Sequence, residues 1–296
     1  MNPHAIVMAF MLMTIFSFKL TASKLVSVSV VDKNYVMVFL QDGEVVFNEN
    51  AATSELIEFG MPLNTSRANN IESWLIKSND DPAFGNNGIM PVQVFRKSKL
   101  SGMSQEQWVH SIFDYHFDWA YEHVLFLQLP SPLQNGKSYT IEVDQGLNID
   151  SLSATFTCDF DTSRSEAVKV NVVGYSTRKS AKIADVYMWM GDGGFRDYGA
   201  FENNDAYIYN VETGEKQLAG KLQFWKKEAA ETSNNHQMIR SDVWSVDFSA
   251  FNTPGKYRII IDGIGCSDNF VIADDVYLEP ARVSTLGFFY MRIGQD

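Results

Sequence analysis

The 296-residue sequence contains only two cysteines, Cys158 and Cys266. Two thiols cannot form the disulfide framework on which small exported domains depend, so large apolar cores must stabilise the chain. We expect both thiols to be free. A single bridge between them, which would join the two halves of the chain, is the alternative.

Basic residues are also scarce. The 24 lysines and arginines are outnumbered by 36 aspartates and glutamates, which gives a formal net charge of -12. Nucleic-acid binding requires clustered positive charge that displaces counterions, so we exclude a nucleic-acid partner. A hydrophobic fraction of 45% and an aromatic fraction of 13% indicate a folded chain with enough core for two domains.

Motifs with known chemistry are missing as well. The sequence has no Gly-x-Ser-x-Gly elbow, no His-Glu-x-x-His helix and no Cys-x-x-Cys pair. The glycine-rich run at residues 191–194 is not followed by a helix that starts with Lys-Ser or Lys-Thr, so it does not predict a phosphate-binding loop. We therefore expect no catalytic residue, no cofactor and no metal site.

One long apolar run occurs at the N-terminus, where residues 5–18 carry no charge. This run is shorter than the roughly 20 residues that cross a membrane, and it has the length of a signal-peptide core. We predict a signal peptide over residues 1–23, cleaved after Ser23, and hence a secreted protein, extracellular or periplasmic, without membrane contact after cleavage. An uncleaved anchor is the alternative.

From Lys24 onward, short apolar runs with alternating polarity predict β-strands. An Asp42-Gly43 pair between two such runs predicts a tight hairpin. Strands are expected at residues 25–31, 35–40, 45–47, 73–77, 91–97, 122–129, 138–143, 152–158, 168–173, 182–190, 206–211, 218–225, 243–248, 255–261 and 266–273.

A weak internal repeat divides the chain. Residues 133–143 and 251–261 share an apolar residue, a turn, Gly-Lys, a tyrosine that can bond back to the turn, and an alternating strand. The polar stretch at residues 159–167 lies between the two halves. We predict an all-β fold of two tandem antiparallel β-sandwiches, at residues 24–160 and 167–275, with a C-terminal helix at 276–296.

Two segments could bind a ligand. Asn79, Asp80 and Asp81 could offer oxygens to calcium, but no complete calcium-loop pattern surrounds them and we expect a solvated loop.

The other segment, residues 108–123, is dense in aromatic rings and histidines. Exposed rings could stack on pyranose faces, and His110, His116 and His123 could bind zinc, although no pair has a recognised zinc spacing. We favour an interpretation in which half of these rings lie in a sandwich core and the histidines lie on its polar face, with sugar contact as the alternative.

Several motifs resemble one family. They are Gly255-Lys256-Tyr257-Arg258, Phe270-Val271-Ile272-Ala273-Asp274, Tyr277-Leu278-Glu279-Pro280, Gly287-Phe288-Phe289-Tyr290-Met291-Arg292-Ile293-Gly294 and, upstream, Val170-Asn171-Val172-Val173-Gly174-Tyr175. Together they resemble the junction in family 9 glycoside hydrolases (cellulases) where an immunoglobulin-like domain precedes the first helix of an (α/α)6 catalytic barrel. Val172, Met291 and Ile293 depart from the family pattern, in which Gln, Gln and Cys are usual.

The resemblance implies a β-1,4-endoglucanase that acts by inversion. Because the family's Asp-Ala-Gly-Asp motif does not occur in the sequence, we expect its catalytic Asp and Glu in a barrel beyond Asp296, with residues 276–296 as the first barrel helix. The implied partners are this barrel and β-glucan. The same resemblance gives the domain-interface candidates Asp192, Arg196, Asp197, Tyr290 and Arg292. The alternative is a stand-alone carbohydrate-binding or surface-adhesion protein of tandem sandwiches.

The C-terminal helix also carries an apolar stripe, which is larger than one sandwich edge could cover. Its members recur at three- and four-residue spacing: Val283, Leu286, Phe289, Tyr290 and Ile293.

Overall fold

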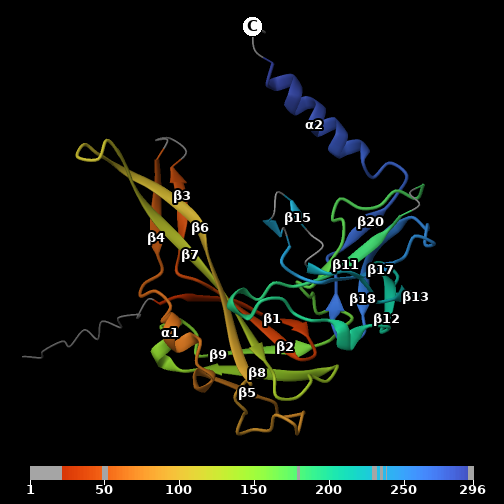
Figure 1. Cartoon of the computed structure of the whole chain (residues 1–296), viewed down its shortest axis with the longest axis horizontal. Helices are drawn as coiled ribbons and strands as arrows, with labels where there is room; N and C mark the ends of the chain where they lie inside the picture. The colour runs from red at the N-terminus through yellow and green to blue at the C-terminus, as the bar shows by residue number, and fades with distance from the viewer. Residues whose placement is uncertain are drawn as a thin grey trace, which may run out of the picture.

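A computed structural model describes residues 22–48, 53–178, 181–228, 232–233, 236–237 and 239–292. Of the expected signal peptide, only Ala22 and Ser23 are described, and Ile293 lies outside the described residues. Ala22 and Ser23 are both buried, and the Ser23 N–H donates to the Asn148 carbonyl at 2.9 Å, so a cleavage after Ser23 would remove contacts of the first domain. The described part consists of several antiparallel sheets with one long helix, α2 (Leu278–Tyr290), which confirms the predicted all-β fold (Figure 1). None of its helices is long and apolar enough to cross a membrane.

The first domain is a sandwich of two antiparallel sheets. One sheet has the order β1-β2-β7-β6 and the other β5-β8-β9, and their apolar faces share one core that includes Trp74, Leu125 and Tyr139. The strands are β1 (Lys24–Asp32), β2 (Tyr35–Gln41), β5 (Trp74–Lys77), β6 (Gln93–Val109), β7 (Asp114–Gln128), β8 (Lys137–Val143) and β9 (Ser153–Cys158), with short helices α1 (Thr65–Ala68), η1 (Ile71–Ser73) and η2 (Gln145–Leu147).

The second domain is also built from two sheets. Their orders are β10-β11-β17-β14 and β13-β12-β18-β19, and β20 pairs with β18. The elements are β10 (Val168–Lys169), β11 (Ile183–Val186), η3 (Gly191–Gly193), η4 (Gly199–Phe201), β12 (Asp205–Asn210), β13 (Lys216–Lys221), β14 (Gln223–Lys226), β15 (Thr232–Ser233), β16 (His236–Gln237), β17 (Val243–Asp247), β18 (Gly255–Ile261), β19 (Gly265–Cys266) and β20 (Phe270–Ile272).

Some expected strands of this domain are shorter or divided. The strand expected at 168–173 ends after Lys169. Beyond it, backbone groups bond to a side chain instead of a neighbouring strand, because the Tyr175 hydroxyl accepts from the Asn171 N–H at 3.0 Å and donates to the Ile183 carbonyl at 2.7 Å. The strand expected at 218–225 is two strands in different sheets, with the fully buried Leu222 between them.

The prediction of a tight hairpin at Asp42-Gly43 is wrong. Strand β2 pairs with β1 and β7, whereas β3 (Gly43–Asn48) pairs with β4 (Thr53–Glu58). The Asp42 carboxylate accepts the Leu63 N–H at 3.0 Å and holds the chain in a bend instead of a turn. Gly43 serves close packing here, since a Cβ at this position would lie 2.7 Å from the carbonyl oxygen of Ile57.

The first domain also carries a long arm that the sequence did not predict. Strands β6 and β7 pair continuously from Gln93 and Gln128 to Val109 and Asp114, far beyond the expected strands at 91–97 and 122–129. The β3–β4 hairpin packs along this arm, and the two hairpins project together from the sandwich (Figure 1). The sequence pattern identified residues 108–123 as an aromatic segment and not as a strand, although rings and polar residues alternate along them from Tyr115 to Trp119.

The internal repeat has the structural meaning that the sequence predicts. The Tyr139 hydroxyl accepts from the Gln134 N–H at 2.8 Å, and the Tyr257 hydroxyl donates to the Pro254 carbonyl at 3.2 Å. Each tyrosine therefore ties the start of its strand to the preceding turn.

The two domains share an apolar core. Val31, Tyr35 and Phe126 of the first sandwich belong to the same buried cluster as the core residues of the second. At the edge of this cluster, Arg196 Nε donates to Asp32 Oδ2 at 2.8 Å, and its guanidinium lies 4.6 Å from the centre of the Tyr35 ring. Asp32 is fully buried, and this burial raises the pKa of its carboxyl while Arg196 opposes the rise. The interface thus combines a shared apolar core with one buried ion pair.

Replacing Arg196 with Met should destabilise the protein by about 3–5 kcal/mol at neutral pH, because it leaves a buried carboxylate unpaired. Burial raises the folded-state pKa of Asp32, so the loss should shrink as the pH falls and the carboxyl takes up a proton. Urea unfolding at several pH values measures this. The control Lys221→Met breaks the exposed pair with Asp205 and should cost less than about 1 kcal/mol. Equal losses would contradict the prediction.

Cys158 and Cys266 are both free and buried. Burial raises the pKa of both thiols, that of Cys158 to about 12, so little reactive thiolate forms. Native protein should resist iodoacetamide at pH 8, and both residues should be alkylated after denaturation without reductant. A mass-spectrometric peptide map checks this, and a peptide in which the two cysteines are linked would refute it.

Candidate functional site

Two of the interface candidates contact the first domain. Asp192 Oδ1 accepts the Arg96 N–H of β6 at 2.7 Å, and Arg196 pairs with Asp32. Asp197 stays within its own domain, where its carboxylate accepts the Gly199 N–H at 2.8 Å at the start of η4. The structure thus brings Asp192 and Arg196 to the joint between the sandwiches. Their contact with a catalytic barrel stays a prediction.

Tyr290 and Arg292 lie far from that joint. Helix α2 extends away from the second domain and has no buried residue, and Tyr290 is 78% exposed (Figure 1). Its start is fixed by the Tyr277 hydroxyl, which donates to the Gly174 carbonyl at 3.0 Å. The helix presents apolar side chains without a covering surface in the described chain.

The aromatic segment does not form a sandwich core, so the favoured interpretation of its rings is wrong. It lies on the arm, where Phe113 is 79% exposed and Trp119 42%. Along β7, the ring centres of Tyr115 and Phe117 are 6.4 Å apart, and those of Phe117 and Trp119 are 6.5 Å apart. Alternate strand residues point to the same face, so these rings form a row along the arm.

A hollow of about 450 Å³ lies beside this row. It is lined by Leu56, Glu58, Asp118, Trp119 and Tyr121. The two carboxylates can accept hydrogen bonds from hydroxyl groups, and the two rings offer faces to an apolar C–H surface. This combination suits a neutral sugar, whose rings have C–H faces and whose edges carry hydroxyls.

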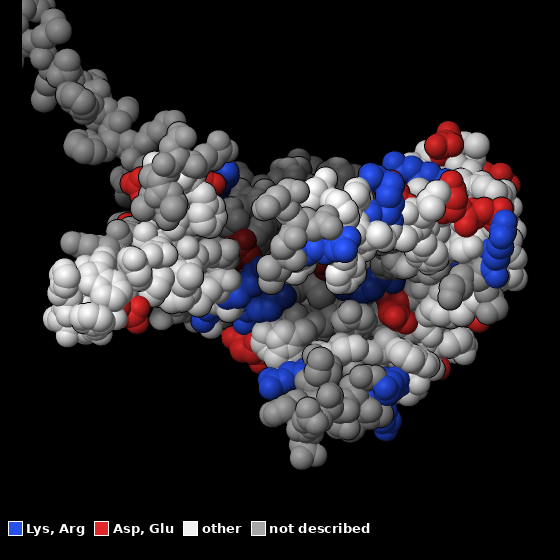
Figure 2. Space-filling model, turned by 90° about the horizontal axis from the view of Figure 1, so that it is seen from above, with Lys and Arg blue, Asp and Glu red and all other residues white. Residues whose placement is uncertain are grey.

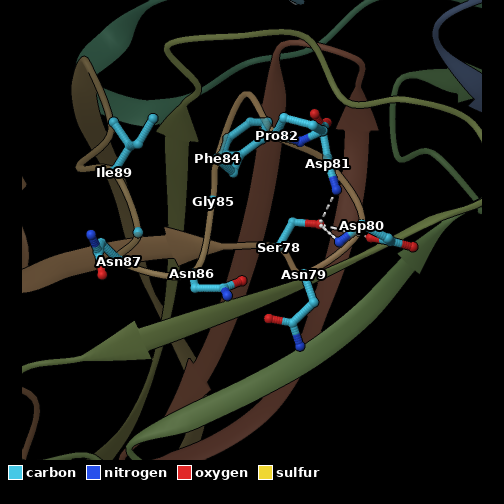
Figure 3. A pocket seen from close by; sticks show the side chains of 11 residues that line it. Ser78, Asn79, Asp80, Asp81, Pro82, Phe84, Gly85, Asn86, Asn87 and Ile89 are labelled. Carbon is cyan, nitrogen blue, oxygen red and sulfur yellow. Dashed lines mark hydrogen bonds between the residues drawn. The ribbon is translucent and has the colours of Figure 1, made fainter.

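The loop with Asn79, Asp80 and Asp81 borders a second hollow, of about 650 Å³ (Figure 3). Its carboxylates have partners within the protein: Asp80 accepts from the Ser78 hydroxyl at 2.8 Å, and Asp81 from the Tyr139 hydroxyl at 2.7 Å. Over the described residues, no group of three His, Cys, Asp or Glu side chains is placed to hold a metal ion.

The three histidines are spread out rather than gathered. His110 and His116 are exposed on the arm, but His123 is 4% exposed, so the prediction that it lies on a polar face is wrong. Its Nε2 lies 3.0 Å from Asp42 Oδ2, and its Nδ1 lies 2.7 Å from the Ser98 hydroxyl.

This Ser98–His123–Asp42 chain has the connectivity of a hydrolytic triad, which sequence reasoning missed. However, the Ser98 hydroxyl also accepts a hydrogen bond from the Arg96 guanidinium, and neither Ser98 nor His123 lines the hollows described above. Asp42 further accepts bonds from the Leu63 N–H and the Ser23 hydroxyl. The chain of bonds therefore serves to anchor the base of the arm.

Replacing Asp42 with Asn should destabilise the protein by about 1–3 kcal/mol at neutral pH. Burial alone would raise the pKa of Asp42, but hydrogen bonds from His123, Ser23 and the Leu63 N–H hold it below its ordinary value. The carboxylate thus stabilises the fold fully at pH values above its unfolded-state pKa of about 3.9. The difference in stability between the unaltered protein and the variant should disappear as the pH falls through the lower pKa that Asp42 has in the folded state.

Thermal unfolding between pH 7 and pH 3 measures this gap. The control Asp205→Asn affects an exposed ion pair and should change stability little. A gap for Asp42→Asn that widens toward low pH would contradict the assignment.

Comparisons with known proteins agree on one part of the chain. Residues 163–266 match the model of the cellulase N-terminal ig-like domain. A stretch of 55 residues is 36% identical to Endoglucanase D of Acetivibrio thermocellus. This stretch makes up 19% of this chain and 9% of that protein. The chain thus spans only a small part of its curated relatives.

Solved structures of two GH9 proteins also align in part. One is from Bacteroides ovatus, with 26% identity over 42% of this chain and 18% of that one, at a TM-score of 0.30. The other is a metagenome-derived endoglucanase, with 22% identity over 38% of this chain and 18% of that one, also at 0.30. The family-model match and the endoglucanase similarity thus show that residues 163–266, which include most of the second sandwich, resemble the N-terminal ig-like domain of cellulases.

Proposed function

We propose that this chain is the non-catalytic N-terminal part of a secreted family 9 glycoside hydrolase whose complete form hydrolyses β-1,4-glucan with inversion. The match over residues 163–266 supports this proposal, because domains of this kind accompany cellulase catalytic domains. Inversion requires two carboxylates with room for a water between them, and we assign both to a barrel that follows the described helix.

Helix α2 is the proposed connection to that barrel. Its side chains Val283, Leu286 and Phe289 are between 37% and 54% exposed, and Phe288 is 75% exposed. A continuous apolar surface of this kind is typical of a site that another domain covers. We propose that Tyr290 and Arg292, at the end of the helix, contact the barrel.

The arm is the proposed contact with β-glucan. The row of rings from Tyr115 to Trp119, beside a hollow with Glu58 and Asp118, is the observation that carries this part of the proposal. Rings along one strand face can stack on successive sugars of an extended chain, and acidic side chains can bind their hydroxyls. Such a contact would hold the enzyme on its substrate without any chemistry in this chain.

A stand-alone binding or adhesion protein is the second candidate, because the exposed aromatic arm needs no catalytic domain to bind a glycan. The genomic reading frame after Asp296 separates the two candidates. A frame that continues into helices with an Asp-Ala-Gly-Asp motif supports the enzyme. A stop codon directly after Asp296 in the intact gene favours the stand-alone protein.

Replacing Trp119 with Ala should weaken binding to β-glucan by about fivefold, since a stacked ring contributes on the order of 1 kcal/mol. Affinity electrophoresis in gels that contain mixed-linkage β-glucan measures the retardation. Trp225 is a matched control, because it is 57% exposed but lies on the second domain.

The Trp225→Ala variant should therefore migrate like the unaltered protein. If the unaltered protein is not retarded, or if both variants lose retardation equally, the arm is not the glucan contact.

A further inference from the structure

A cleft of about 410 Å³ lies between the two domains. Met37, Phe39 and Val124 from strands β2 and β7 line one side, and Tyr187 and Trp189, which follow β11, line the other. Figure 2 shows a hollow between the two domains, with Lys and Arg side chains near it. The cleft is separate from the hollow on the arm, with which it shares no lining residue.

The polar lining of the cleft is more basic than the rest of the protein. It comprises three lysines, Lys97, Lys99 and Lys169, and two glutamates, Glu122 and Glu166, in a chain with a net charge of -12. Because the lysines outnumber the glutamates, one positive charge is left over in the cleft.

The leftover charge belongs to Lys97. Lys99 pairs with Glu122 at 2.9 Å. Glu166 pairs with Lys169 at 3.4 Å and also with Arg164 at 2.5 Å. The charge of Arg164 is balanced in turn by Asp268 outside the cleft. Lys97 forms no ion pair with any described residue. Its ammonium lies 5.9 Å from the centre of the Phe126 ring. Burial, together with Lys99 and Lys169, lowers the pKa of Lys97, while Glu166 opposes this. An anionic group in the cleft would relieve the repulsion between these lysines.

We propose that this cleft binds an oligosaccharide that carries a uronic acid. The sugar carboxylate accepts hydrogen bonds from the Lys97 ammonium, and the pyranose ring lies against Trp189 and Tyr187. Neighbouring hydroxyl groups donate to the carboxylates of Glu122 and Glu166. The ligand thus supplies the one negative charge that the cleft lacks, and hydroxyls for the acceptors that it has.

Other anions fit this lining less well. A phosphate carries close to two negative charges at neutral pH and would lie near two glutamates, which repel it. A neutral glucan would leave the Lys97 ammonium without a partner, and burying such a charge is costly. The aromatic wall and the paired acceptors favour a ring with one carboxylate and several hydroxyls.

The test uses two probes that differ only at one group: xylotetraose with a single glucuronic acid branch, and the same oligosaccharide with the branch carboxylate reduced to the neutral primary alcohol. Isothermal titration calorimetry at low salt should show that the acidic sugar binds at least about tenfold more tightly, as expected for a hydrogen bond between charged groups. Binding should weaken as salt screens the charges.

Variants of the cleft lysine complete the test. Lys97→Met keeps an apolar stem over Phe126 but should lose about tenfold in affinity for the acidic sugar, with no change for the neutral one. Lys97→Arg should retain binding. Lys256→Met, at an exposed position on β18, is the control and should bind normally.

Three results would overturn the proposal: equal affinity for both sugars, no binding of either, or normal binding by Lys97→Met. The neutral β-glucan assay with Trp119→Ala probes the arm alone, so the two sites can fail independently.

Discussion

The buried pair between Asp32 and Arg196 sets the relation between the two sandwiches. Breaking a buried pair leaves an uncompensated charge, so the pair favours the orientation in which Arg196 of the second domain lies against Asp32 of the first. Tyr35 contributes a ring face to the same guanidinium and belongs to the core that both domains share. The cleft between the domains keeps its shape because this joint cannot slide without separating the charges.

Much of the fold could be predicted from local pattern. Alternating apolar residues marked most core strands, and two turns with Gly-Lys and a tyrosine marked the repeat. These features could be predicted because each depends only on residues that are close together in the sequence. In the second domain the motifs around Tyr175 and Tyr257 marked two turns. Its strands were predicted less well than those of the first domain, since the segments expected at 168–173 and 218–225 are shortened or divided.

The candidate sites were predicted less well, because they depend on pairing at long range. The arm alternates rings with polar residues as a core strand does, so the pattern alone could not show that its rings face solvent. Asp42, Ser98 and His123 are far apart in the sequence and meet only because β2, β6 and β7 are neighbours. Likewise, Asp192 was expected to contact another domain, but nothing in the sequence named Arg96 as its partner.

The loop at η3 has a consequence for how such proteins can be rearranged in evolution. A Cβ at Gly191 would lie 2.1 Å from the Arg96 carbonyl oxygen, and one at Gly193 would lie 2.4 Å from the Phe95 ring. The glycines of one sandwich are therefore matched to a strand of the other. A gene fusion that placed an unrelated domain before this immunoglobulin-like domain would lose the close contact between these glycines and strand β6. We therefore expect the two sandwiches to be inherited together.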